Sequence, residues 1–280
     1  MNINWFPGHM NKSLRMMDES IKQVDAVIYV LDARAPFSCV NPELNKVIGE
    51  KPIIYVLNKA DLVPENVLND CIKKFSGEKS FALKMQATTS KSSAIIIERL
   101  KKLCSAKLER KQAKGVNAVL RAMVIGVPNT GKSTIINNLC GKAKTATGNK
   151  AGVTRGKQWV NIDRGFDVLD TPGTLYPKLD NFETALNLAF IGSIRDEVLD
   201  LYELSLELIK KLQIICPAVF STRYGISTFS TEPETLAGIA RARGFLLKGG
   251  EVDSERAALA LVDDFRKGRL GKIILEKVES

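Results

Sequence analysis

The stretch Gly126-Val127-Pro128-Asn129-Thr130-Gly131-Lys132-Ser133-Thr134 decides the fold. An apolar run at residues 122–125 precedes it, and a helical pattern at residues 135–139 follows it. A strand, a glycine-bounded loop and a helix in this order form a phosphate loop, in which backbone N–H groups and the helix N-terminus bind phosphate oxygens. A chance glycine turn explains the pattern poorly, because the preceding strand is present. The stretch therefore predicts binding of a nucleoside triphosphate.

Each residue type in this loop has a predicted task. Gly126 and Gly131 let the backbone wrap closely around phosphate. Lys132 is expected to reach the β- and γ-phosphates, and the hydroxyl of Ser133 is expected to bind Mg²⁺. The predicted nucleotide contacts in this loop are Asn129, Thr130, Gly131, Lys132, Ser133 and Thr134.

A second motif, Asn58-Lys59-Ala60-Asp61, follows an apolar strand pattern at residues 52–57. A carboxylate such as that of Asp61 can accept hydrogen bonds from N1–H and the 2-amino group of guanine. Adenine has neither donor and leaves the carboxylate unpaired. We expect Asn58 to tie this loop to the phosphate loop and the stem of Lys59 to cover the base. Alone the tetrapeptide is typical of a turn, but beside a phosphate loop it predicts guanine recognition.

A further base-contacting loop is expected after the strand predicted at residues 80–85. Its sequence matches such a loop poorly, and the predicted contacts are Gln86 and Ala87. An adenine-nucleotide kinase is the alternative from another class. Asp61 and the absence of a kinase acceptor-site pattern oppose it.

A third motif, Asp170-Thr171-Pro172-Gly173, ends a hairpin predicted at residues 158–163 and 165–169. Asp170 is expected to hold Mg²⁺ through water, and the N–H of Gly173 to contact the γ-phosphate. Thr154 lies about twenty residues after the phosphate loop, as does the threonine that closes on Mg²⁺ in a GTPase switch. The predicted magnesium ligands are therefore Ser133, Thr154 and Asp170.

The composition is that of a globular protein, with 280 residues of which 45% are hydrophobic and 26% charged. No apolar run approaches the ~20 residues that a membrane helix needs, and the first residues carry no signal-peptide pattern. Five widely spaced cysteines without a Cys-x-x-Cys pair predict a reduced, cytoplasmic protein and no zinc site. Any catalytic metal should therefore have oxygen ligands.

The formal charge of +10 is unevenly distributed, with +12 in residues 1–182 and −2 in residues 183–280. Two segments concentrate the positive charge. The first is a helical pattern for which a solvated face and an RNA contact are equally good explanations; its cations are Arg99, Lys101, Lys102, Lys107, Arg110, Lys111 and Lys114. The second has no acidic residue and is harder to explain as a solvated surface than as an RNA contact; it holds Lys142, Lys144, Lys150, Arg155 and Lys157.

The order of the motifs is rotated relative to ordinary small GTPases, in which the phosphate loop comes first and Asn-Lys-x-Asp comes late. In one continuous parallel sheet, a connector at residues 115–120 joining the old termini would preserve every strand neighbour. Helical periodicity, including one long helix expected at residues 95–111, fills the remainder. We expect an α/β fold: a Rossmann-like P-loop GTPase domain with circularly permuted motif order at residues 1–180, then a smaller all-helical domain at residues 181–280.

On these residues the chain resembles the circularly permuted ribosome-biogenesis GTPases of the YlqF/RbgA family. Further segments carry the resemblance, and the first and last of them are specific to that family: Trp5-Phe6-Pro7-Gly8-His9-Met10-Asn11-Lys12, Asp32-Ala33-Arg34-Ala35-Pro36, Gly249-Gly250-Glu251-Val252-Asp253 and residues 266–271. The resemblance implies a monomeric hydrolase that converts GTP to GDP and matures the large ribosomal subunit. It also implies stimulation of hydrolysis by the pre-ribosomal particle and a helical C-terminal domain that contacts ribosomal RNA. The alternative is a nucleotide-gated RNA-binding module in which hydrolysis is incidental.

Three residues modify this expectation. Thr174 stands where Ras-like enzymes have the glutamine that orients water, so slow intrinsic hydrolysis is implied. His9, the only histidine, lies in a motif whose histidine is suspected of a catalytic part in the family; packing beside Trp5 and Phe6 is the other interpretation. Asn129 resembles the asparagine of potassium-activated GTPases and is a candidate K⁺ ligand, or an amide that only stabilises the loop.

Overall fold

The structure is a computed structural model that describes residues 17–88, 93–114, 119–141, 157–163, 165–173, 175, 181–227 and 231–278. Several residues singled out from the sequence therefore lie outside the described part: His9, Thr154, Thr174 and the basic residues at positions 142, 144, 150 and 155. No helix among the described residues is long and apolar enough to cross a membrane.

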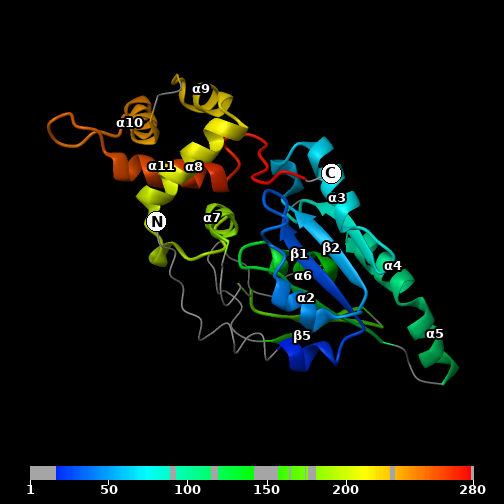
Figure 1. Cartoon of the computed structure of the whole chain (residues 1–280). Coiled ribbons are helices and arrows are strands. Elements are labelled where there is room, and N and C mark those ends of the chain that lie inside the picture. The colour runs from blue at the N-terminus through cyan, green and yellow to red at the C-terminus, as the bar shows by residue number, and fades with distance from the viewer. Residues whose placement is uncertain are drawn as a thin grey trace.

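A six-stranded sheet forms the centre of the fold (Figure 1). Its order is β3-β2-β1-β4-β6-β5. The strands expected at residues 52–57, 80–85, 122–125, 158–163 and 165–169 all form. The bounds of the six strands are β1 Ala26–Asp32, β2 Ile53–Asn58, β3 Ser80–Met85, β4 Leu120–Ile125, β5 Gln158–Asp163 and β6 Phe166–Asp170. β5 pairs antiparallel with β6, which confirms the hairpin predicted there, while the description of the whole sheet as one continuous parallel array is wrong at this edge. The short β5–β6 connection imposes this direction, because parallel neighbours need a crossover.

Helices cover both faces of the sheet, and every residue of β1 is therefore buried. Val27, Tyr29 and Leu31 belong to one hydrophobic cluster, which includes α2 (Pro42–Ile48) and α3 (Glu65–Phe75). Ala26, Ile28 and Val30 belong to a second cluster, which includes residues of α4 (Ser93–Leu103) and α6 (Lys132–Cys140). Alternating side chains thus meet helices on opposite faces, as in other parallel sheets.

The single helix expected at residues 95–111 is wrong. The structure has α4 and then α5 (Ser105–Ala113), separated at Cys104. Ile96 and Leu100 of α4 are buried against the sheet, whereas none of the described residues of α5 is buried. The break at Cys104 therefore lies where full burial against the sheet ends.

Helices α7 to α11 follow the sheet, as the helical periodicity predicts. Their bounds are α7 Phe182–Phe190, α8 Leu201–Ile215, α9 Ala218–Tyr224, α10 Glu232–Ala242 and α11 Ser254–Arg266. Thr231 and Asp253 cap α10 and α11 at their N-termini, as expected for these residue types. One hydrophobic cluster runs from the sheet into these helices. The last described residues then return to the sheet beside α3 (Figure 1), where the Leu275 N–H donates to the carbonyl of Arg34.

Candidate nucleotide-binding site

The three motifs meet at the carboxyl edge of the sheet. The phosphate loop follows β4, the Asn-Lys-Ala-Asp loop follows β2, and Asp170 ends β6. β1 and β4 are adjacent, and the chain leaves them toward opposite edges of the sheet. In open α/β sheets, ligands bind at such a switch point, outside the carboxyl ends of the strands.

Two glycines make the phosphate loop possible. Gly126 has φ +147°, and a Cβ on it would lie 2.3 Å from the carbonyl oxygen of Val30. Gly131 has φ +97°, and its Cβ would lie 2.2 Å from Nδ2 of Asn58. Any larger residue at either position would push the loop away from β1 or from the Asn58 loop. Both glycines thus allow a close approach of the loop to its neighbours, and their wrapping around phosphate stays a prediction.

Asn58 joins three loops, and its predicted link to the phosphate loop is present. Its Nδ2 donates to the carbonyl of Thr130 at 2.7 Å, and its Oδ1 accepts from the N–H of Ala87 at 3.0 Å. The side chain is 4% exposed. Gln86, beside Ala87, is half-buried, and Asn138 of α6 donates to the Ala87 carbonyl. The weakly matching segment after β3 is therefore brought to the same site.

The side chains of Lys59 and Asp61 leave the same turn with different surroundings. Lys59 has φ +59°, and its ammonium group contacts Oδ2 of Asp32 at 2.7 Å. Asp61, in the short helix η1 (Ala60–Leu62), is exposed. The turn thus holds the Lys59 stem against the end of β1 and leaves the Asp61 carboxylate accessible to a base.

Lys132 lies folded onto its own loop. Its amine donates to the carbonyls of Gly126 at 3.1 Å and Val127 at 2.9 Å. Burial lowers the pKa of Lys132 to about 8, although Asp170 opposes this shift. A Cβ on Gly173 would lie 2.8 Å from Cα of Pro128 and 3.0 Å from Nζ of Lys132. The chain after Asp170 therefore packs directly on the phosphate loop.

Asp170 has the properties expected of a magnesium-site carboxylate. It is 2% exposed, and within the described part of the chain its Oδ1 is buried without a hydrogen-bond partner. Burial raises the pKa of Asp170 to about 6, although Lys132 and the Thr171 N–H oppose this. A hard cation with oxygen ligands would satisfy this oxygen, and Ser133 at the start of α6 supplies a hydroxyl from the same loop. The residues present thus fit Mg²⁺.

An Asp170→Asn variant tests the burial of this carboxylate. When the pKa of a carboxyl group is higher in the folded than in the unfolded chain, the group destabilises the fold as the pH rises above the unfolded pKa. The full cost is reached above the folded pKa. We therefore expect the metal-free variant to be about 1–3 kcal/mol more stable than the wild type at pH 7.5, with the gain shrinking as the pH falls from about 6 to 4. Urea unfolding measures both, and exposed Asp163→Asn is the control. An unchanged midpoint at pH 7.5 would contradict the account.

The phosphate loop also contacts the helical part of the chain, which the sequence did not predict. Nδ2 of Asn129, which has φ +61°, donates to the Gly192 carbonyl. Oγ of Ser193 donates to the Pro128 carbonyl at 2.7 Å. Gly192 and Ser193 lie just after the C-cap of α7. The hydrogen bond from Asn129 to Gly192 thus fits the interpretation that this amide stabilises the loop.

A second contact of this kind involves Asp32, the last residue of β1, and Arg34, two residues later. Arg34 is 1% exposed and binds both carboxylate oxygens of Asp32, at 2.9 and 2.7 Å. Its Nη1 also donates to the last carbonyls of α11, those of Phe265 and Arg266, each at 3.1 Å. Burial opposes ionisation of Asp32, but Arg34 and Lys59 outweigh it and hold the pKa of Asp32 well below its usual range. A buried chain of charges thus links Lys59 to α11.

Comparison with known proteins gives concordant results. A protein-family profile described as a 50S ribosome-binding GTPase matches residues 121–216. Ribosome biogenesis GTPase A of Bacillus cereus is 34% identical, over 100% of this chain and 95% of that protein. The protein of the same name from Thermotoga maritima is 33% identical, over 99% and 95%.

Two solved structures agree in fold. The GNP-bound YlqF of T. maritima superposes with a TM-score of 0.66 at 27% identity, covering 96% of this chain and 99% of that chain. A GDP-bound YlqF structure gives a TM-score of 0.65 at 29% identity, covering 94% and 99%. The similarity therefore extends over the sheet and the helices that follow it.

Proposed function

This chain belongs to the ribosome biogenesis GTPase A family, and from that premise we propose that it binds and hydrolyses GTP while assisting assembly of the large ribosomal subunit in the cytoplasm. The observation that carries the proposal is the convergence of the phosphate loop, the Asp61 loop and Asp170 at one edge of the sheet. Asn58 supports it by bonding to two of the loops at once.

The chain's own residues have distinct roles in this proposal. Asp61 selects guanine, and Lys59 covers the base. Lys132 exchanges its loop carbonyls for the β- and γ-phosphates, while backbone N–H groups of residues 129–134 and of Gly173 bind phosphate oxygens. Ser133, Thr154 and, through water, Asp170 would hold Mg²⁺, which neutralises developing negative charge on the phosphates when bound. Asn129 is a candidate ligand for K⁺ as well as the partner of Gly192.

The proposal assigns different roles to the two parts of the chain. Residues 1–180 form the GTPase domain, and residues 181–280 form a helical domain that contacts ribosomal RNA. The bonds from Pro128 and Asn129 to Ser193 and Gly192 support communication between them. We expect the protein to act as a monomer and the basic stretch at residues 142–157 to meet RNA when GTP is bound.

Hydrolysis is expected to be slow in the free protein, because Thr174 has no amide to orient water. We propose that His9 supplies the missing group on the particle, since imidazole can orient water near neutral pH. His9→Ala should then keep GTP affinity and particle binding but lose most particle-stimulated turnover, by roughly 10²-fold or more. Unchanged stimulated turnover would leave His9 as a packing residue.

Co-sedimentation with large-subunit precursor particles tests the proposal. A non-hydrolysable GTP analogue should retain the protein on the particle, and GDP should release it. Gly173→Ala is the informative variant, because its methyl group would collide with the backbone of Pro128. It should weaken the difference between the two nucleotides. Retention that is the same with the analogue, with GDP and without nucleotide would contradict a GTP-controlled role.

A further inference from the structure

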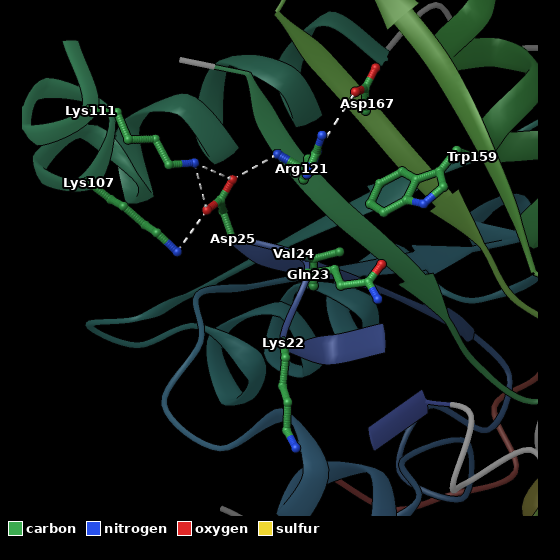
Figure 2. A pocket seen from close by; sticks show the side chains of 9 residues that line it. All are labelled: Lys22, Gln23, Val24, Asp25, Lys107, Lys111, Arg121, Trp159 and Asp167. Atoms are coloured by element: carbon green, nitrogen blue, oxygen red, sulfur yellow. Dashed lines mark hydrogen bonds and ion pairs between the residues drawn. The ribbon is translucent and has the colours of Figure 1, made fainter. Parts of the chain in front are cut away.

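A cavity lies away from the nucleotide site, at the amino edge of the sheet (Figure 2). Its volume is about 490 Å³, within the range of small-ligand pockets. Segments from four parts of the chain line it: residues 22–25 before β1, α5, the start of β4, and the β5–β6 pair. The phosphate loop begins at the opposite end of β4, so a ligand here would leave the GTP site accessible.

The lining of this cavity is positively charged overall. Four cations, Lys22, Lys107, Lys111 and Arg121, face two carboxylates, Asp25 and Asp167. Asp25 is 7% exposed and already bonded to Lys107, Lys111 and the Arg121 N–H. Within the described chain no carboxylate pairs with Lys22. The excess of positive charge, with Asp25 fully engaged, suits an anionic ligand.

Trp159 supplies a flat apolar surface beside these charges. It is one of two tryptophans in the chain and is 42% exposed on β5, although a tryptophan gains most when buried. The guanidinium carbon of Arg121 lies 5.4 Å from the centre of its ring. Figure 2 shows Trp159 and Arg121 side by side at the cavity. An aromatic ring next to cations is the usual platform for an unpaired base and its phosphates.

Helix α5 extends the basic surface away from the cavity. It projects from the body of the molecule (Figure 1), and none of its residues is buried. Its ion pairs to Asp25 point Lys107 and Lys111 toward the cavity, while Arg110 and Lys114 continue the charge along the exposed helix. Leu108 of α5 packs against the hydrophobic cluster of the sheet, and the exposed cations farther along the helix suit contact with a polyanion.

We propose that this cavity binds an unpaired RNA nucleotide, with its base against Trp159 and the neighbouring phosphates on Lys22 and α5. The inference rests on the proposed function only in that the RNA is expected to be ribosomal. Binding at the amino edge would give the GTPase part of the chain its own RNA contact, independent of the helical domain and of the bound nucleotide.

Tryptophan fluorescence gives a direct readout, because Trp5→Phe leaves Trp159 as the only tryptophan. A 12-nucleotide single-stranded RNA should quench Trp159, and the same strand in a duplex should quench it far less. Adenosine monophosphate should quench only at much higher concentration, since it lacks the flanking phosphates. RNA binding seen by anisotropy without quenching, or equal affinity for the mononucleotide, would overturn the proposal.

Variants in the full-length chain separate this site from the rest of the account. Trp159→Ala should weaken RNA binding by roughly tenfold and Trp159→Phe far less, given the contribution of base stacking. Lys22→Gln should lower the salt dependence by about 0.7 unit if it contacts one phosphate, whereas Lys73→Gln, an exposed lysine of α3, should not. GTP affinity should stay unchanged in all four. Wild-type RNA affinity and salt dependence in both Trp159→Ala and Lys22→Gln would refute this site, while co-sedimentation would still judge the proposed function.

Discussion

Asp61→Asn is expected to lower affinity for GTP by roughly 10²-fold or more and to shift preference toward xanthosine triphosphate. A site built to pair with donors on its ligand discriminates strongly, because an unmatched polar group inside it stays unpaired. The variant replaces one acceptor oxygen by an N–H donor that faces the donors of guanine, whereas xanthine presents a carbonyl at that position. The exposed position of Asp61 beside the Lys59 turn lets it act in this way without a structural role.

Competition binding with GTP, xanthosine triphosphate and ATP measures this effect. Asp70→Asn is a matched control, since Asp70 is an exposed aspartate of α3 whose ion pair is with Lys73. The control should bind GTP as the wild type does. If the wild type binds ATP and GTP within about threefold of each other, far less than the discrimination such sites reach, Asp61 does not read the base.

Arg34→Met is expected to destabilise the protein by about 3–5 kcal/mol, as removal of one partner from a buried ion pair does. The change would leave Asp32, which is 0% exposed, with Lys59 as its remaining cation. It would also remove the hydrogen bonds from Arg34 to the carbonyls at the end of α11. Because Asp32 positions Lys59, GTP affinity should fall together with stability.

Urea unfolding and GTP binding of the folded variant measure these two losses. Lys267→Met is the control, because Lys267 is 54% exposed and pairs with Asp263, which is 45% exposed, at the same end of α11. An exposed pair of this kind contributes about 0–1 kcal/mol. Equal losses in the two variants would show that the Asp32–Arg34 pair has no special part in joining α11 to the nucleotide site.

The sequence predicted the parts of the site that depend on local order. Residue types that follow a buried strand must emerge at the carboxyl edge of a parallel sheet, so the three motifs could be placed together before the structure was known. The bond between Asn58 and Thr130 was expected for this reason. The antiparallel direction of β5 was likewise predicted, as a hairpin, from its short connection to β6.

Contacts between segments far apart in the sequence could not be predicted from the spacing of residues. Arg34 and Phe265 are 231 positions apart, and no periodicity in the sequence indicates that Arg34 caps the C-terminal end of α11. The signal available was an aspartate that ends a fully buried strand and an arginine two residues later, a place where charged groups need partners. The break between α4 and α5 was missed for a related reason, since helical periodicity does not tell where packing on a sheet ends.

GTP turnover measured with and without large-subunit precursor particles tests the central claim most directly. A GTPase that acts in subunit assembly should be slow alone and should accelerate by roughly 10²-fold or more on the particle, once the missing water-orienting group is supplied. Mature large subunits are the control for general ribosome contact. Turnover that is the same with and without particles, in a protein that still binds them, would contradict the account and favour a nucleotide-gated RNA-binding module in which hydrolysis is incidental.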